Sequence, residues 1–515
     1  MGKEQEYARI VGAARLKKLG QFFTPNEIAD FMAKWVVQKS GTVLDPAVGN
    51  SVFFRSILCQ DTVSRLMTGY EIDDKILTFF GTISESIVHN EDFLFADWKT
   101  KYDCIICNPP YNRFQSIEQR DLLYNVFYEH TGISFTKYTN QYILFLIKSL
   151  YQLNTYGRLA FIIPSEFLNS KYGDRVKELL LKDGILRAIV NFQNDSNVFY
   201  NSITTCCIVL VENTPRQLGS VEFVNIVDVS ELKQLKIHGD RLSESSIEID
   251  SEKLFSEKKW LPLLKNNQLR EYHNTIECST FFTARRGIAT GDNDYFLFNL
   301  SRIESLKLPM RYFTKCISKS MDVKGPFFED SDFMRLSSEG KNVYLLDIKV
   351  PLCKVIASYI SQGEMNQVHE KYLPKHRKPW YAQESKKPAE IWIVSAGRGE
   401  IKVIRNLTNV VNLTTFHGIY VTQDYEALTN AIFCYLLTPI GQELLKYNKK
   451  ELGGGLDKFQ PNDINEAMML DLRFLSVSQM ERINSLYEQM KKCLSRSHIS
   501  PIIEELNGIF SNLLQ

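Results

Sequence analysis

Short apolar runs alternate with segments of helical periodicity up to about Val211, and this alternation constrains the fold more than any other feature. Such alternation is typical of a doubly wound α/β domain with a largely parallel sheet. In sheets of this kind, ligands bind beyond the carboxyl ends of the strands. The segments concerned are strands within 42–49, 66–73, 102–110, 157–168, 184–192 and 204–211, and helices within 51–58, 140–153 and 173–184.

The pattern changes after Glu212, where the polar stretch "SESSIEIDSEKLFSEKKW" is typical of a connection. We predict a first domain over residues 1–245, a connecting segment over 246–280 and a second domain over 281–515. The second domain closes with helices in "SQMERINSLYEQMKKCLSR" and "PIIEELNGIFSNLL". A chain of 515 residues, 44% hydrophobic and 23% charged, can form two or three cored domains and shows no bias towards disorder.

Composition limits the cellular context and the partners. No apolar run reaches the length of about 20 residues that a membrane span needs, and the N-terminus lacks the apolar stretch of a signal peptide. We therefore expect a cytoplasmic protein with no membrane partner. The net charge of +1 means that any basic surface must be local.

Cys104 and Cys107 would point to opposite faces of a strand, so we expect reduced core thiols and no metal site.

The stretch "YDCIICNPPY", residues 102–111, ends a buried strand abruptly. Pro109 and Pro110 cannot donate to the hydrogen-bond ladder, so the backbone must leave the sheet at Asn108. A stiff loop at the carboxyl end of a strand can hold an amide, a carbonyl and the ring of Tyr111 against one small planar group.

Three earlier loops carry small or acidic residues. "VLDPAVGNSVF", residues 43–53, places Asp45 and small residues between a strand and a helix, where the helix N-terminus favours an anionic group. A structural turn is the alternative. Glu71 in "GYEIDD" can accept both hydroxyls of a ribose, or be a surface acid at a strand end. Asp92 and Phe93 in "NEDFL" suit the amine edge and the face of an adenine. In this order the loops indicate an adenosyl pocket followed by a substrate clamp.

With "GQFFTP" at residues 20–25 upstream, these motifs resemble the gamma-class amino-methyltransferases, the Taq-type DNA adenine-N6 methylases of restriction–modification systems. The resemblance is strongest over roughly residues 20–211. It implies a Rossmann-like methyltransferase domain that uses S-adenosylmethionine, followed by a mixed α+β target-recognition domain that binds DNA. The chain departs from the family where Ser51 replaces the usual second glycine of the loop and Val48 replaces a common cysteine.

The resemblance also assigns residues around the cofactor. The ribose would be held by Glu71, and the adenine by Asp92 and Phe93. The methionine part would be held by Thr24, Asp45 and Ala47, with Gly49 in the same loop.

Amine chemistry gives the NPPY run its expected role. The exocyclic nitrogen of adenine is a poor nucleophile because its lone pair is conjugated into the ring. The side-chain oxygen of Asn108 and the carbonyl of Pro109 would accept its two N–H bonds and leave the lone pair facing the methyl group, while Pro110 stiffens the loop. Tyr111 would stack on a base flipped out of the duplex. By resemblance, Phe199 in "NVFYNSITT" forms the opposite wall; a core position is the alternative.

Two basic stretches of the second domain are candidates for contact with double-stranded DNA. A mixture of basic and aromatic side chains suits phosphate contact and groove packing, although a solvated surface and turn chemistry are the alternatives. The candidates are Arg285 and Arg286 in "RRGIATGDNDYF", and Lys375, Arg377, Lys378, Trp380 and Tyr381 in "KYLPKHRKPWYAQESKKP".

Other activities remain open from the residues alone. An RNA adenine methyltransferase and a protein glutamine N5 methyltransferase are the alternatives; a non-catalytic DNA-binding subunit is disfavoured by the intact run from Asn108 to Tyr111. We expect a monomer on duplex DNA. Because few residues precede Gly20, a cognate restriction endonuclease, where one exists, is expected on a separate chain.

Overall fold

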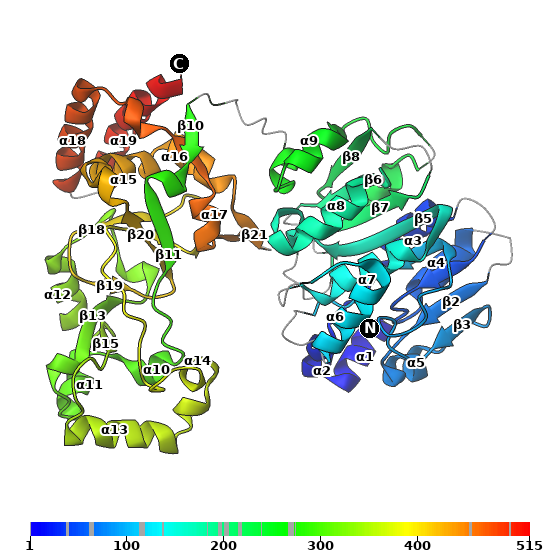
Figure 1. Cartoon of the computed structure of the whole chain (residues 1–515), viewed down its shortest axis with the longest axis horizontal. Helices are drawn as coiled ribbons and strands as arrows, with labels where there is room; N and C mark the ends of the chain where they lie inside the picture. Colours follow the sequence, from blue (N-terminus) through cyan, green and yellow to red (C-terminus); the bar gives the residue numbers. More distant parts are fainter. Residues whose placement is uncertain are drawn as a thin grey trace. The chain divides into compact units, whose positions relative to one another are not determined.

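The chain folds into two compact units in a computed structural model (Figure 1). The first unit spans Met1–Gln268 and includes Glu451–Gly455, and the second spans Leu269–Lys450 and Leu456–Gln515. The structure describes residues 2–37, 41–60, 66–112, 119–135, 139–182, 184–193, 198–199, 205–214, 219–237, 239–265, 272, 274–452, 456–493 and 496–514.

A nine-stranded sheet with the order β3-β2-β1-β4-β5-β7-β6-β8-β9 forms the centre of the first unit. The first five strands in this order, β3, β2, β1, β4 and β5, are parallel to one another. The direction reverses at β7, which is antiparallel to both β5 and β6. This arrangement confirms the predicted doubly wound α/β fold. The strands are β1 (Val43–Asp45), β2 (Met67–Tyr70), β3 (Ser86–His89), β4 (Tyr102–Cys107), β5 (Leu153–Pro164), β6 (Leu186–Phe192), β7 (Cys206–Glu212), β8 (Ser220–Ile226) and β9 (Ile247–Asp250).

Helices cover both faces of this sheet (Figure 1). Because side chains alternate along a strand, Ile105 and Cys107 belong to one core and Cys104 and Ile106 to the other, as predicted for the two cysteines. One face carries α3 (Asn26–Val36) and α4 (Val52–Gln60), and the other carries α6 (Arg120–Thr131), α7 (Gln141–Tyr151) and α8 (Asp174–Lys182). The remaining helices are α1 (Lys3–Val11), α2 (Ala13–Leu19), α5 (Asp74–Phe80) and α9 (Ser251–Ser256).

The first unit extends beyond residue 245, into the stretch whose polar sequence suggested a connection. Strand β9 pairs antiparallel with β8, and Leu254 and Trp260 are buried in the core of the unit. The polar character of the stretch is that of an edge strand, since Glu248 and Asp250 face solvent while Ile249 is buried.

The second unit mixes helices and strands, as predicted, and contains two cores. In β16 (Ile391–Val394), Ile391 and Ile393 join the core beneath the C-terminal helices, whereas Trp392 and Val394 join the other core. The main sheet has the order β11-β20-β16-β18-β14, with β11 (Phe282–Arg286) at one edge, and then β20 (Phe416–Val421), β18 (Val403–Asn406) and β14 (Phe327–Phe328).

The second unit also contains three smaller sheets and several helices. A second sheet consists of β12 (Leu297–Phe298), β15 (Tyr344–Leu346), β13 (Phe313–Ile317) and β19 (Val411–Asn412). Two small sheets consist of β10 (Thr275–Glu277) with β23 (Met468–Leu470), and of β17 (Ala396–Gly397), β22 (Leu456–Lys458) and β21 (Lys450–Leu452). The helices are α10 (Asn293–Phe296), α11 (Leu300–Ser305), α12 (Asp330–Ser338), α13 (Lys354–Met365), α14 (Tyr372–Lys375), α15 (Thr429–Leu437), α16 (Pro439–Lys446), α17 (Pro461–Asn465), α18 (Val477–Lys491) and α19 (Arg496–Ser511).

Two kinds of feature are absent from the described ranges. No helix in them is long and apolar enough to cross a membrane. No group of three or more His, Cys, Asp or Glu side chains in the same residues is arranged to hold a metal ion.

Candidate cofactor and catalytic site

A cavity of about 540 Å³ lies in the first unit, where the loops that follow β1, β2, β3 and β4 meet. The loops lie at the carboxyl ends of the parallel strands, where a doubly wound fold binds its ligands. The cavity brings together most of the residues predicted for the cofactor and for the amine. These are Thr24, Ala47, Gly49, Glu71, Asp92, Phe93, Asn108 and Pro110. Asp45, Pro109, Tyr111 and Phe199 do not line it.

Glu71 directly follows β2, and its carboxylate is held by two backbone amides. The Gly49 N–H donates to Oε2 at 2.9 Å, and the Asp73 N–H donates to Oε1 at 2.9 Å. Burial raises the pKa of Glu71, and these two amide hydrogen bonds act in the opposite direction. The carboxylate is therefore fixed in place at the wall of the cavity, with lone pairs that can still accept hydroxyl groups.

The loop after β1 contains two residues with left-handed backbone conformations, Gly49 at φ 54° and Ser51 at φ 61°. Ser51 thus occupies a conformation that favours glycine, which accounts for the glycine usual at this place in the family the sequence resembles. Its hydroxyl is buried and has no hydrogen-bond partner among the described residues. The replacement therefore keeps the loop shape at the expense of backbone strain.

Asp45 is completely buried beneath this loop. Its Oδ1 accepts the Ala47 N–H at 3.1 Å, while its Oδ2 has no hydrogen-bond partner within the described part of the chain. Burial, with a smaller contribution from nearby Glu71, raises the pKa of Asp45 to about 8. Asp45 therefore supports the loop from beneath through Ala47 and is not part of the cavity wall.

Asp92 and Phe93 follow β3 in a loop that a buried lysine supports. The Lys148 ammonium, on α7, donates to the carbonyls of Phe93 at 2.5 Å and Ala96 at 2.9 Å, and lies 4.5 Å from the Phe93 ring centre. Burial lowers the pKa of Lys148 to about 7. Burial also raises the pKa of Asp92, whose Oδ1 accepts the Leu94 N–H. Lys148 is thus a supporting residue that the sequence did not reveal, because its apolar helix suggested only core packing.

The amide of Asn108 has one end anchored and the other open. Its Nδ2 donates to the Phe22 carbonyl at 2.9 Å and to Thr24 Oγ1 at 3.0 Å. Its Oδ1 is buried and has no hydrogen-bond partner in the described ranges. The two donor contacts fix which way the amide points, so Asn108 presents a preorganised acceptor. Thr24, expected at the methionine part, also orients this amide.

Tyr111 lies in an aromatic cluster next to this amide. Its ring centre is 5.2 Å from that of Phe22 and 6.0 Å from that of Phe199, which it meets edge to face. Its hydroxyl donates to the Ile162 carbonyl at 3.1 Å, and burial raises the pKa of Tyr111 well above its usual value. Pro109 is buried, and Phe199 is buried against the cluster. The two rings touch, so a base could enter between them only if one ring moved.

In the second unit, Arg285 and Arg286 are exposed on the edge strand β11. Arg377, by contrast, donates to the carbonyls of Ala289 and Thr290. Trp380 packs on Tyr295 and donates from Nε1 to Glu364. Both side chains therefore make contacts within the second unit, a structural role that the basic and aromatic pattern did not distinguish from DNA contact. Of the other candidates, Lys375 and Lys378 are exposed and Tyr381 is half-buried.

Comparison with known proteins gives the family. The family described as "N-6 DNA Methylase" matches residues 5–262, which is half of the chain, and the C-terminal domain of the "Type II methyltransferase M.Eco57I" matches residues 254–507. The chain belongs to the N-6 DNA methylase family. It is accordingly a DNA adenine methyltransferase, as the sequence motifs predicted.

Two relatives align with nearly the whole length of this N-6 DNA methylase. The type II methyltransferase M.AccI of Acinetobacter calcoaceticus is 35% identical over 521 aligned residues, covering 99% of this chain and 96% of the relative. The type II methyltransferase M.XamI of Xanthomonas campestris pv. amaranthicola is 21% identical over 90% of this chain and 87% of its own.

A solved structure is similar in fold. The type IIL restriction–modification enzyme MmeI in complex with DNA matches 99% of this N-6 DNA methylase and 75% of its own chain, with a TM-score of 0.57 and 13% identity. At this identity the similarity concerns the fold alone.

Proposed function

We propose that this methylase transfers a methyl group from S-adenosylmethionine to N6 of an adenine that is flipped out of duplex DNA. The observation that carries this proposal is the amide of Asn108. Its nitrogen is held by Phe22 and Thr24, and its buried oxygen lacks a partner among the described residues. An acceptor held in this way suits an N–H donor brought by the substrate.

The cofactor would occupy the cavity beside this amide. A bound S-adenosylmethionine supplies an electrophilic methyl group on a sulfonium centre. Glu71 would hold the ribose hydroxyls, Asp92 and Phe93 the adenine ring, and Thr24 and Ala47 the methionine part, with Asp45 supporting the Ala47 loop from beneath. The residues present fit this group, since the cavity combines acidic and apolar walls and its volume falls in the range of small-molecule sites.

At the target nitrogen, the chain's own contribution is orientation. Asn108 Oδ1 would accept one N–H of the amine and the Pro109 carbonyl the other, which leaves the nitrogen lone pair directed at the methyl carbon. No strongly basic side chain is needed, because the nitrogen becomes acidic once it is methylated. Tyr111 would stack on the base, with Phe199 as the opposite wall after the two rings separate.

The second unit would select the target sequence on double-stranded DNA, with Arg285, Arg286, Lys375 and Lys378 as exposed contacts to the phosphates. Arg377, Trp380 and Tyr381 would support this surface. We place the enzyme in the cytoplasm, acting as a monomer within a restriction–modification system; a cognate endonuclease, where one exists, would be a separate chain. Support comes from its relative M.AccI, which is described as a type II methyltransferase.

Methyl transfer from labelled S-adenosylmethionine tests the proposal. Duplex DNA, RNA and a release-factor-like protein are compared as acceptors, and the modified nucleoside is identified by mass spectrometry. We expect label only in duplex DNA, as N6-methyladenine. Label in RNA, in protein, or at a cytosine would contradict the proposed substrate.

A further inference from the structure

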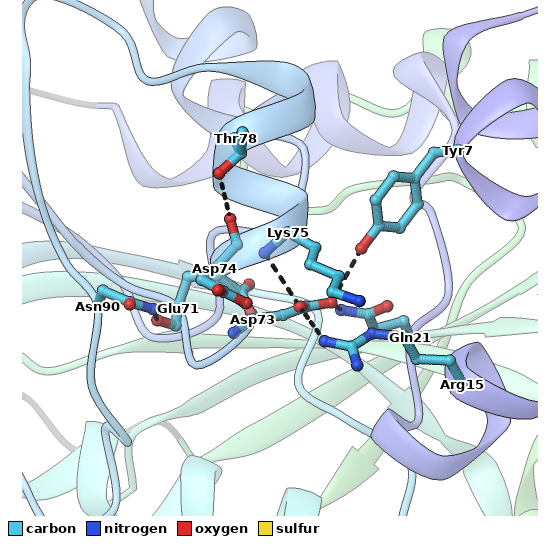
Figure 2. A network of polar contacts seen from close by, with 9 residues as sticks. All are labelled: Tyr7, Arg15, Gln21, Glu71, Asp73, Asp74, Lys75, Thr78 and Asn90. Atoms are coloured by element: carbon cyan, nitrogen blue, oxygen red, sulfur yellow. Dashed lines mark hydrogen bonds and ion pairs between the residues drawn. The ribbon is translucent and has the colours of Figure 1, made fainter. Parts of the chain in front are cut away.

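The N-terminal segment, here residues 3–24, connects to one buried carboxylate. Asp73 is 2% exposed, and its Oδ2 accepts from the Tyr7 hydroxyl at 2.9 Å and from Gln21 Nε2 at 3.0 Å. Its Oδ1 accepts from Arg15 Nη2 at 2.7 Å. Figure 2 shows these three side chains, from α1, α2 and the stretch that follows, converging on Asp73.

Helix capping does not explain this convergence. Asp73 is the N-cap of α5, but that role uses a single hydrogen bond, from the Lys75 N–H at 3.2 Å. The other three donors come from residues at least 52 positions earlier in the chain. Although burial alone would raise the pKa of Asp73, the hydrogen bonds from Arg15, Gln21 and Tyr7 hold it below the usual value, so the group remains charged.

Asp73 is also joined to the carboxylate at the cavity wall. Its own N–H donates to Glu71 Oε1 at 2.9 Å, and the Glu71 carbonyl accepts from Asn90 Nδ2 at 2.7 Å. A shift of the backbone at Asp73 would therefore disturb one of the two amide hydrogen bonds that hold the Glu71 carboxylate. The side chain of Asp73 binds the N-terminal segment, while its backbone positions Glu71.

The same N-terminal segment forms part of the cavity and touches the NPPY loop. Lys18, Gln21 and Phe23 are among the residues that line the cavity. Gly20 has φ +65°, and its carbonyl accepts the Tyr111 N–H at 3.3 Å; a Cβ there would lie 2.8 Å from Asn112 Oδ1. The segment therefore lies against both the cofactor cavity and the NPPY loop.

A second contact fastens the start of the segment to the loop after β1. Asn50 Nδ2 donates to Glu4 Oε1 at 3.1 Å. The segment is thus attached to the two loops that carry Gly49 and Glu71, which lie on the cofactor side of the cavity.

We propose that Asp73 is a positioning residue that closes the N-terminal segment over the bound cofactor and at the same time sets the Glu71 carboxylate for the ribose. This inference rests on the proposed S-adenosylmethionine site. It predicts that loss of the Asp73 charge weakens cofactor binding more than it slows methyl transfer, because a bound cofactor itself helps to hold the segment in place.

Asp73→Asn tests this directly, with Asp74→Asn, an exposed acid one position later, as the matched control. We expect the dissociation constant and KM for S-adenosylmethionine to rise about tenfold in Asp73→Asn, since charge-assisted hydrogen bonds are replaced by weaker ones. The kcat at saturating cofactor should stay within about twofold of the wild type. Asp74→Asn should match the wild type in both constants.

Limited trypsin digestion reports on the segment itself. Cleavage after Arg9, Arg15 and Lys18, followed by mass spectrometry of the released N-terminal peptides, should be faster in Asp73→Asn than in the wild type, and S-adenosylmethionine should slow it in both proteins. If Asp73→Asn does not fold, Tyr7→Phe removes one of the donors alone; it should raise the cofactor dissociation constant about threefold.

Wild-type cofactor affinity and wild-type peptide release in the folded variants would overturn the inference. Equal losses of kcat and affinity would also overturn it, because they would indicate general disruption of the fold. Glu71→Gln separates this failure from failure of the proposed function. If Glu71→Gln binds S-adenosylmethionine normally, the cofactor site itself is wrong; if it loses binding while Asp73→Asn does not, only the role of Asp73 is wrong.

Discussion

At the scale of single residues, we propose that methyl transfer depends most directly on Asn108. Its orientation comes from Phe22 and Thr24, which lie 86 and 84 positions earlier in the chain. The sequence predicted a role for this amide, because two prolines directly after a buried strand force the backbone out of the sheet at Asn108. It did not identify what turns the amide, because that interaction joins distant parts of the chain.

Asn108→Ala should separate binding from chemistry. Loss of one preorganised polar contact at a reacting centre typically costs about 3 kcal/mol or more, so the rate of methylation should fall by about two orders of magnitude or more. The dissociation constants for cofactor and for DNA should change little. Single-turnover methylation and equilibrium binding measure the two effects, and Asn366→Ala, at an exposed position of the second unit, is the control. Methylation at the normal rate would mean that the NPPY loop is only a rigid turn.

Lys148 should make the stability of the first unit depend on pH. Its pKa is lowered from 10.5 to about 7 by burial, so between pH 7 and about 10.5 the unfolded chain binds a proton that the folded chain does not. The free energy of unfolding therefore rises with pH across this interval, by at most about 1.4 kcal/mol per pH unit from this group.

Lys148→Met should remove this contribution. Urea unfolding of wild type and variant at pH 7, 8 and 9 gives the difference in the free energy of unfolding, and we expect that difference to shift in favour of the wild type as pH rises. Lys99→Met, at an exposed position, controls for the loss of a positive charge. A difference that does not vary with pH would show that Lys148 keeps its proton in the folded state.

At the scale of elements, the central strands of the first unit were predictable because they are buried on both faces and form continuous apolar runs. Strands β3 and β9 were missed because they are the two edge strands of the sheet and expose polar side chains. The segment 371–388 was a harder case. Nothing in its composition indicates that Trp380 packs on Tyr295 or that Arg377 reaches the carbonyl of Thr290, since both partners are more than 80 positions away.

We expect the basic residues of this segment to have two different functions, DNA binding and stabilisation of the second unit. Lys375→Gln with Lys378→Gln should weaken DNA binding and reduce its salt dependence by roughly one unit of slope for each phosphate that is no longer neutralised. Arg377→Gln should instead lower the melting temperature of the second unit, because its guanidinium holds two backbone carbonyls. DNA titrations at several salt concentrations and thermal melts measure these effects, with the exposed Lys341→Gln as control. A salt slope unchanged in the double variant would show that the two lysines are solvated surface.

At the scale of the whole molecule, each unit has its own buried cores, so each has the means to unfold separately. Calorimetry should show two transitions. S-adenosylmethionine at about one hundred times its dissociation constant should raise the free energy of unfolding for one transition by about 2.7 kcal/mol and leave the melting temperature of the other unchanged. A single transition that shifts as a whole would mean that the units unfold together.

The residues that line the cofactor cavity all lie between Lys18 and Phe145, and the sheet that supports them is complete at Asp250. During synthesis, the cavity can therefore form while the second unit is still being translated, a delay on the order of tens of seconds at elongation rates of about 5 to 20 residues per second. A nascent chain would bind its cofactor before it could read DNA. Cofactor present in the cell would then act as a folding aid for the growing chain, and starvation for it should lower the yield of the protein as well as its activity.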